Sequence, residues 1–391
     1  MMLPSEAALK QQQLIQSYPA EVQSQVQLLT RRLLVLGFAS QFTKLVEGPV
    51  VNTFYFKPLG DSRFSAILSK EEELAAVLSV ESVRVERELG ECTIAVPRFN
   101  RELIKFDSCL HKMMTSPITA EMQLPLLMGV STNGEHLYAD LANQPHLLIA
   151  GATNSGKSVY TAQLICSLSL FRDDSELEFT LVDTKNLDLV LFKELSHVKY
   201  VLSSISDIRA VLVRLLEEVR LRNAQMSGLA RNIREWNLMQ AGLDRRMQYK
   251  ILVIDELADV LMQDEAILAK YPKKERPPAI MDLLQQLGQI SRASGIHLVL
   301  ATQRPSVDVL PGSIKTNFPA RVSFKLPTKA DSRVILDENG AENLLGKGDY
   351  LYKIAGSDSI KRAHSAFVSI NDIATIIAQN DMIRKQYEVM R

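Results

Sequence analysis

Short apolar runs, separated by segments with helical spacing, dominate the chain from about residue 141 onward. The runs lie at residues 146–150, 178–183, 251–255, 296–302 and 320–326. Strands that are apolar along nearly their whole length are typical of a parallel sheet whose two faces are both covered by helices. The pattern therefore predicts an α/β domain with a mostly parallel sheet.

The residues before this domain follow other periods. Apolar positions at spacings of three, four and seven in residues 5–36 predict an amphipathic helix that breaks near Pro19. This helix either packs on its own domain or docks onto a neighbouring subunit. Three strands and one helix are then expected, at residues 50–56, 83–85 and 93–96 and at residues 71–78.

These elements predict a division of the chain into four segments. A stretch at residues 129–134 that contains Gly, Ser, Thr and Asn is the expected boundary region between the two domains. The expected segments are an N-terminal helical segment (1–36), a small α+β domain (37–140), the α/β domain (141–370) and a C-terminal helical tail (371–391).

Composition and charge narrow the class of protein. The 45 basic and 45 acidic residues give a net charge of zero, so a nucleic-acid partner would need a local basic surface. The three cysteines have no paired spacing, which argues against a disulfide framework or a zinc site. No apolar run approaches the roughly 18 residues of a membrane span, and no signal peptide is visible. We expect a cytoplasmic protein with no membrane segment.

The candidate chemistry begins at a loop that fits the pattern G-x-x-x-x-G-K-[ST]. It follows the first predicted strand and precedes a helix expected at residues 159–170, which is the context that a phosphate-binding loop requires. Its amide groups would converge on the β-phosphate of a nucleotide at a helix N-terminus. Lys157 would reach the β- and γ-phosphates, and Ser158 would hold Mg²⁺. The loop consists of Gly151, Ala152, Thr153, Asn154, Ser155, Gly156, Lys157 and Ser158.

Polar residues end three further predicted strands at the same expected edge of the sheet. Asp255 would bind the Mg²⁺ held by Ser158, and Glu256 would polarise the attacking water as a general base. Gln303 would sense the γ-phosphate or orient the water, and a loop-capping amide is the alternative interpretation. Residues 183–185 end another strand at this edge and would line the site, and a surface position for Lys185 is the alternative.

Several longer motifs point to a family. They are the run that leads into the phosphate loop at 145–148, DELAD at 255–259, GIHLVLATQRPSVDV at 295–309, DSRVILD at 331–337 and GAENLLGKGD at 340–349. Together they closely resemble the FtsK/SpoIIIE DNA translocases. Residues 47–51 resemble the start of that family's smaller domain, so the resemblance covers roughly residues 40–370.

The resemblance implies a RecA-like P-loop ATPase that uses ATP and Mg²⁺, assembles as a homo-hexameric ring and acts on double-stranded DNA. ATP would lie between subunits of such a ring, so a neighbouring subunit should supply an arginine finger. Arg292, eleven residues before Gln303, is the first candidate and Arg333 is the second. A surface or salt-bridging arginine is the alternative for each.

The resemblance also suggests where DNA would be held, through sequence-independent contacts to phosphates. The basic stretch at residues 271–278 stands where this family carries a pore loop, and a solvated charged loop is the alternative. A segment at residues 228–233 resembles a second family motif ahead of the other pore-facing loop. The expected DNA-contacting residues are Lys273, Lys274, Arg276, Arg231 and Arg234.

The chain departs from the family pattern in a few places. Asn154 stands where glycine is usual, and asparagine tolerates a left-handed backbone. Residues 183–185 read Asp-Thr-Lys in place of the usual Asp-Pro-Lys. We expect neither a membrane anchor nor a winged-helix domain, so septum anchoring and sequence-guided polarity are not expected either.

The function that these patterns favour is ATP-driven translocation of double-stranded DNA. One alternative is a related ring ATPase that exports protein substrates or couples DNA to a transfer channel. The other is a non-catalytic nucleotide switch or scaffold, against which the intact Lys157, Asp255 and Glu256 argue.

Overall fold

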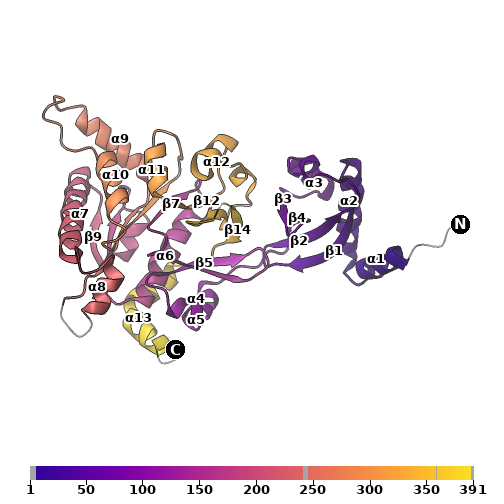
Figure 1. The fold of residues 1–391 in the computed structure, drawn as a ribbon, viewed down its shortest axis with the longest axis horizontal. Helices are drawn as coiled ribbons and strands as arrows, with labels where there is room; N and C mark the ends of the chain where they lie inside the picture. The colour runs from indigo at the N-terminus through magenta and orange to yellow at the C-terminus, as the bar shows by residue number, and fades with distance from the viewer. Residues whose placement is uncertain (1–5, 241–244, 358, 389–391) are drawn as a thin grey trace. The chain divides into compact units, whose positions relative to one another are not determined.

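The structure, a computed structural model, describes residues 6–240, 245–357 and 359–388, which form two compact units (Figure 1). One unit comprises the chain up to Leu103 together with Val130–Glu135. The other comprises Ile104–Gly129 and the chain from His136 onward. The smaller compact unit therefore differs from the domain expected at residues 37–140 at both limits: it also includes the N-terminal helices, and apart from Val130–Glu135 it ends at Leu103.

The smaller unit is an antiparallel sheet with helices packed on it. Its strand order is β1-β2-β4-β3. Leu29 and Leu33 of the second helix are fully buried in a core with Phe54, Phe56 and Ile94 of the sheet, so this helix packs on its own unit. The predicted smaller α+β domain is confirmed. Its elements are α1 (Glu6–Gln16), α2 (Ala20–Val35), β1 (Ser40–Glu47), β2 (Val51–Pro58), η1 (Phe64–Ala66), α3 (Glu71–Leu78), β3 (Arg84–Glu88) and β4 (Glu91–Pro97).

The larger unit is built on a ten-stranded sheet of order β6-β5-β14-β13-β12-β7-β11-β10-β8-β9. The six strands from β12 to β9 are parallel, whereas β13 runs antiparallel to both β12 and β14. The predicted mostly parallel sheet is confirmed. Its strands are β5 (Pro125–Ser131), β6 (His136–Asp140), β7 (His146–Ala150), β8 (Leu177–Val182), β9 (Val198–Leu202), β10 (Tyr249–Ile254), β11 (Ile296–Thr302), β12 (Ala320–Phe324), β13 (Asp349–Lys353) and β14 (Lys361–His364).

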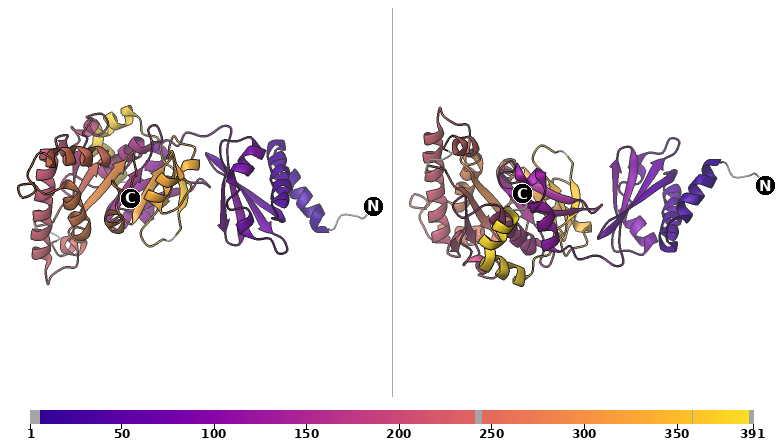
Figure 2. Two further views of the ribbon diagram at one scale, coloured as in Figure 1. Left: turned by 90° about the horizontal axis from the view of Figure 1, so that it is seen from above. Right: turned by 90° about the horizontal axis from the view of Figure 1, so that it is seen from below.

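Helices cover both faces of this sheet (Figure 2). Leu252 and Leu298 share a core with α7, α9 and α10, while α6 packs with α4 and α13. The intervening residues Ile251 and Val299 are also buried, as expected when both faces are covered. The helices are α4 (Phe106–Met114), α5 (Pro117–Ala120), α6 (Lys157–Phe171), η2 (Leu189–Phe192), α7 (Ile205–Met226), α8 (Ile233–Met239), α9 (Leu257–Leu268), α10 (Ile280–Ile290), α11 (Gly312–Asn317), α12 (Lys329–Leu336), η3 (Ala341–Asn343) and α13 (Ile370–Glu388).

The parallel register determines where the candidate residues meet. Strands β7, β11, β10 and β8 are neighbours, and their carboxyl ends lie at one edge of the sheet. The phosphate loop follows β7, and the polar residues predicted for the site follow the other three strands. In the part of the chain that the structure describes, no helix combines the length and the apolar composition needed to cross a bilayer.

Candidate functional site

The phosphate loop connects β7 to α6 through two positions with a left-handed backbone. Gly156, the N-cap of α6, has φ +114°, and Asn154 has φ +62°. The first value is one that glycine adopts without strain and that a residue with a Cβ avoids. Asparagine is among the residues that tolerate the second. At Gly151 a Cβ would lie only 2.5 Å from Ser155 Oγ and 2.7 Å from Phe324 Cβ, so both glycines of the motif are required.

Backbone hydrogen bonds from three neighbouring segments hold the loop. The Gly151 amide donates to Thr302 O at 3.2 Å, and the Ala152 amide donates to Lys325 O at 2.9 Å. On the other side, the Gly348 amide donates to Ser155 O at 2.9 Å. These contacts with three strand ends fix the backbone of the loop.

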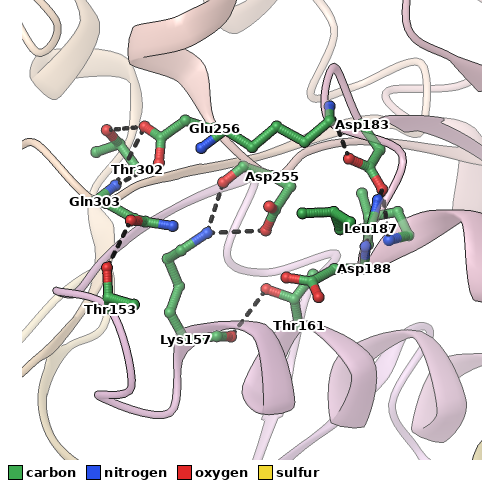
Figure 3. Close-up of polar contacts among 12 residues, drawn as sticks. Thr153, Lys157, Thr161, Asp183, Leu187, Asp188, Asp255, Glu256, Thr302 and Gln303 are labelled. Carbon is green, nitrogen blue, oxygen red and sulfur yellow. Dashed lines mark hydrogen bonds and ion pairs between the residues drawn. The ribbon is translucent and has the colours of Figure 1, made fainter. Parts of the chain in front are cut away.

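Lys157 is buried at the end of this loop, where its charge is paired. Its Nζ donates to Asp255 Oδ1 at 2.8 Å and to Asp255 O at 2.7 Å (Figure 3). The residue is only 3% exposed, so the ammonium needs a partner of opposite charge. Phosphate oxygens carry negative charge, as the Asp255 carboxylate does, and could replace it as the partner of the ammonium. Lys157 already lies at the loop where these oxygens would bind.

Glu256 is turned toward the end of the neighbouring strand β11. Its Oε1 accepts from Thr302 Oγ1 at 2.7 Å, and its Oε2 accepts from the Gln303 amide at 2.9 Å. The Gln303 side chain accepts from Thr153 Oγ1 at 3.0 Å (Figure 3). Gln303 therefore links the carboxylate of Glu256 to the phosphate loop, through its backbone on one side and its side chain on the other.

Ser158 and Asp255 are suitable ligands for a hard cation. Within the described residues, no hydrogen bond is formed by the Ser158 hydroxyl, and Asp255 Oδ2 also lacks one. Hydroxyl and carboxylate oxygens are the donors that Mg²⁺ takes alongside phosphate oxygens and water. The chemistry of these two donors fits Mg²⁺.

Residues 183–185 shape the edge of the site through structural contacts. Asp183 Oδ2 accepts the amides of Leu187 and Leu189, both at 2.9 Å, and this fixes the loop after β8. Thr184 Oγ1 donates to Asp259 Oδ2 at 2.5 Å and so ties this loop to the first turn of α9.

The two candidate arginine fingers lie at different edges of the sheet. Arg333 is exposed on α12, which follows the carboxyl end of β12 and so belongs to the edge of the phosphate loop. Arg292 is exposed in the turn between α10 and β11, at the amino end of the strand. Arg292 is therefore separated from the phosphate loop of its own chain by the length of β11.

The structure divides the five basic residues expected to contact DNA into two groups. Lys273, Lys274 and Arg276 are exposed in the loop between α9 and α10, close to the start of α7. Arg231 and Arg234 lie beyond the other end of α7, where Arg231 pairs with Glu235. A helix of 22 residues spans about 33 Å, so the two groups are not one surface patch.

Sequence reasoning did not identify two contributors to this edge. Thr302 is the residue before Gln303 and supplies a hydroxyl to Glu256. Gly348 has φ +98° and lies against Gly156, where a Cβ would be 2.6 Å from the Gly348 nitrogen. The two glycines of Gly346-Lys347-Gly348 were a local signal for a close backbone approach.

Two family profiles match the sequence of this chain. The sequence profile of the FtsK/SpoIIIE family matches residues 112–307, and that of the FtsK alpha domain matches residues 3–97. The chain belongs to the FtsK/SpoIIIE family. The resemblance noted from the sequence motifs is thereby confirmed.

Relatives in the family are similar over most of this chain. The DNA translocase FtsK of Leptospira interrogans is 34% identical over 353 residues, which are 88% of this chain and 36% of the relative. The DNA translocase FtsK of Helicobacter pylori is 33% identical over 379 residues, which are 94% of this chain and 42% of the relative. The chain thus spans less than half the length of these FtsK proteins.

Solved structures show the same fold at lower identity. The pCW3 conjugation coupling protein TcpA, bound to ATPγS, matches with a TM-score of 0.60 at 20% identity, covering 90% of this chain and 98% of TcpA. The cytoplasmic domain of the Thermomonospora curvata type VII secretion ATPase EccC matches with a TM-score of 0.58 at 21% identity, covering 72% of this chain and 34% of that chain. The predicted RecA-like P-loop ATPase fold is confirmed.

Proposed function

We propose that this chain hydrolyses ATP and uses the energy to move double-stranded DNA through a homo-hexameric ring. The observation that carries the proposal is the meeting of three charged side chains at one sheet edge. Lys157 contacts Asp255 at 2.8 Å, and Glu256 follows directly on the same strand end. In a member of the FtsK/SpoIIIE family, this set supports phosphoanhydride hydrolysis.

Binding of ATP changes the partner of Lys157. Its ammonium exchanges the Asp255 carboxylate for oxygens of the β- and γ-phosphates, while the amides of the phosphate loop hold the β-phosphate. Asp255 and Ser158 are then available to hold Mg²⁺, which neutralises phosphate charge when it is bound. Glu256 takes a proton from the attacking water, and Gln303 is close enough to the loop to orient that water.

The neighbouring subunit of the ring completes the site with an arginine. Arg333 and Arg292 are both exposed, so each is available to a partner subunit. DNA is held at its phosphates, and the loop with Lys273 and Lys274 is the first candidate for that contact. The relatives named DNA translocase FtsK support DNA as the substrate.

The test is the ATPase rate with and without long linear duplex DNA. We expect duplex DNA to stimulate the rate, and we expect Lys273→Gln/Lys274→Gln to weaken DNA binding. A plot of log affinity against log salt falls with a slope whose magnitude is about 0.9 for each phosphate contact. Loss of two contacts in the double variant should therefore reduce the magnitude of the slope by about 1.8. Lys361→Gln removes an exposed lysine on β14 and is the control.

An ATPase rate indifferent to DNA would contradict the proposal. It would favour the alternative in which a related ring ATPase exports protein substrates. A rate that is stimulated by DNA but unchanged in the double lysine variant would retain the translocase proposal and reassign the DNA contact to other residues.

A further inference from the structure

An ion pair between a partly buried arginine and a buried aspartate joins α7 to α9 away from the nucleotide site. Arg209 Nη2 on α7 contacts Asp264 Oδ1 on α9, and the Asp264 side chain is only 4% exposed. The second oxygen, Asp264 Oδ2, accepts the Ile280 amide at 2.9 Å. Arg209 also donates from Nε to Pro278 O at 3.1 Å.

These contacts close the base of the loop between α9 and α10. Asp264 lies on α9 one turn before the loop begins, and Pro278 and Ile280 stand where it ends. Arg209 therefore holds the two ends of the loop together from a third element. The loop has few hydrogen bonds of its own, among them the Glu275 amide to Pro272 O at 2.9 Å.

Helix α9 connects this base to the hydrolytic carboxylates. It begins at Leu257, directly after Glu256, and its first turn is tied to the loop after β8 through Asp259. Its 12 residues span about 18 Å. If the C-terminal end of α9 is fixed to the loop that carries Lys273 and Lys274, a displacement of Glu256 moves that loop together with the helix.

The chemistry of the pair favours a positioning role over a purely stabilising one. A buried ion pair contributes little net stability relative to apolar residues of similar size, because both ions lose their hydration. Here Arg209 and Asp264 each form a further hydrogen bond with the backbone at the loop's end, at Pro278 and Ile280. The pair thus specifies where the loop is held.

We infer that Arg209 is a positioning residue that fixes the loop of Lys273 and Lys274 to α9 and so couples DNA binding to ATP hydrolysis. The inference rests on the proposed function, since it assigns that loop to duplex DNA. Arg209 itself touches neither the nucleotide loop nor the carboxylates that follow β10, within the contacts of the described residues.

The main test variant is Arg209→Met/Asp264→Leu, which removes both charges and leaves no uncompensated ion in the interior. We expect its ATPase rate without DNA to stay within about twofold of wild type, and the duplex concentration for half-maximal stimulation to rise at least about fivefold. Arg209→Lys keeps a cation but not the forked donor, and we expect an intermediate effect. Arg214→Met removes an exposed arginine from the same helix and should behave as wild type.

Limited trypsin digestion without DNA gives a second readout. Cleavage after Lys273 or Lys274 should be at least about fivefold faster in the double variant than in Arg214→Met, because the loop base is released, and Arg209→Lys should fall between the two. If wild type is stimulated by duplex DNA and the double variant shows the same half-maximal concentration, the inference is overturned and the proposed function stands. Unchanged cleavage in Arg209→Lys also overturns it. If wild type is not stimulated, both fall.

Discussion

The substitution Gly156→Ala tests the phosphate loop at its most constrained point. Gly156 has φ +114° at the N-terminus of α6, a backbone conformation that costs a residue with a Cβ roughly 1–3 kcal/mol. The added Cβ would also lie 2.6 Å from the nitrogen and 2.8 Å from the Cα of Gly348. Both are backbone atoms, so no rotamer change relieves the overlap, and overpacking of this kind costs about 1–3 kcal/mol.

These two terms together predict a loss of about 2–6 kcal/mol. If the substituted alanine keeps the native backbone, the loss appears in the free energy of unfolding. If the loop relaxes instead, nucleotide binding must restore its binding conformation, and a cost of 2 kcal/mol alone weakens the affinity by roughly 30-fold. The two quantities must therefore be measured on the same variant.

Urea unfolding and titration with a fluorescent ATP analogue supply the two numbers. Gly312→Ala is the matched control, because Gly312 has no positive φ and a Cβ there would meet no atom within 4 Å. We expect this control to change stability by less than about 1 kcal/mol. Wild-type stability combined with wild-type nucleotide affinity in Gly156→Ala would refute the reasoning about the loop.

Two further predictions concern the carboxylate proposed as the general base and the stability at acid pH. Glu256→Gln should lower the ATPase rate by about 10²–10⁴-fold and leave nucleotide affinity near wild type; an unchanged rate would remove Glu256 from the role of base. Burial lowers the pKa of His146 to about 3 and that of His297 to about 4, so both rings stay neutral in the folded chain between pH 6.5 and about pH 4, whereas the unfolded chain binds protons there. The free energy of unfolding is therefore not reduced by these rings above pH 6.5. As the pH falls from 6.5 toward 4, it decreases by up to roughly 1.4 kcal/mol per pH unit for each ring. Urea unfolding between pH 7 and pH 4 checks this, and an unchanged pH dependence in His297→Gln would contradict it.

The sequence predicted the central strands well, because burial on both faces leaves an apolar run that needs no further context. Every residue of β7 and of β11 is buried. Strand β1 was not recognised, because it is half exposed and a register shift between Phe42 and Lys44 interrupts its alternation. Strands β13 and β14 were also missed, since they carry Asp349 and Arg362, a charged pair whose burial is visible only after the strands meet.

In the site, too, local patterns were visible in the sequence, whereas contacts between distant segments were not. Lys157, Asp255 and Glu256 could be proposed as site residues from the sequence, because each lies at a strand end or in a motif of fixed spacing. Contacts such as Thr153 with Gln303 join residues 150 positions apart and depend on which strands become neighbours. The sequence already assigned the basic residues to two loops, but charge alone does not show that the length of α7 separates these loops.

The measurement that tests the central claim most directly is ATP-driven displacement of a third strand from a triplex on linear duplex DNA. The account predicts displacement by the wild-type chain with ATP, and none without ATP or by the Glu256→Gln variant. A wild-type chain that hydrolyses ATP but leaves the triplex intact on every duplex tested would contradict the claim that hydrolysis at this site moves DNA.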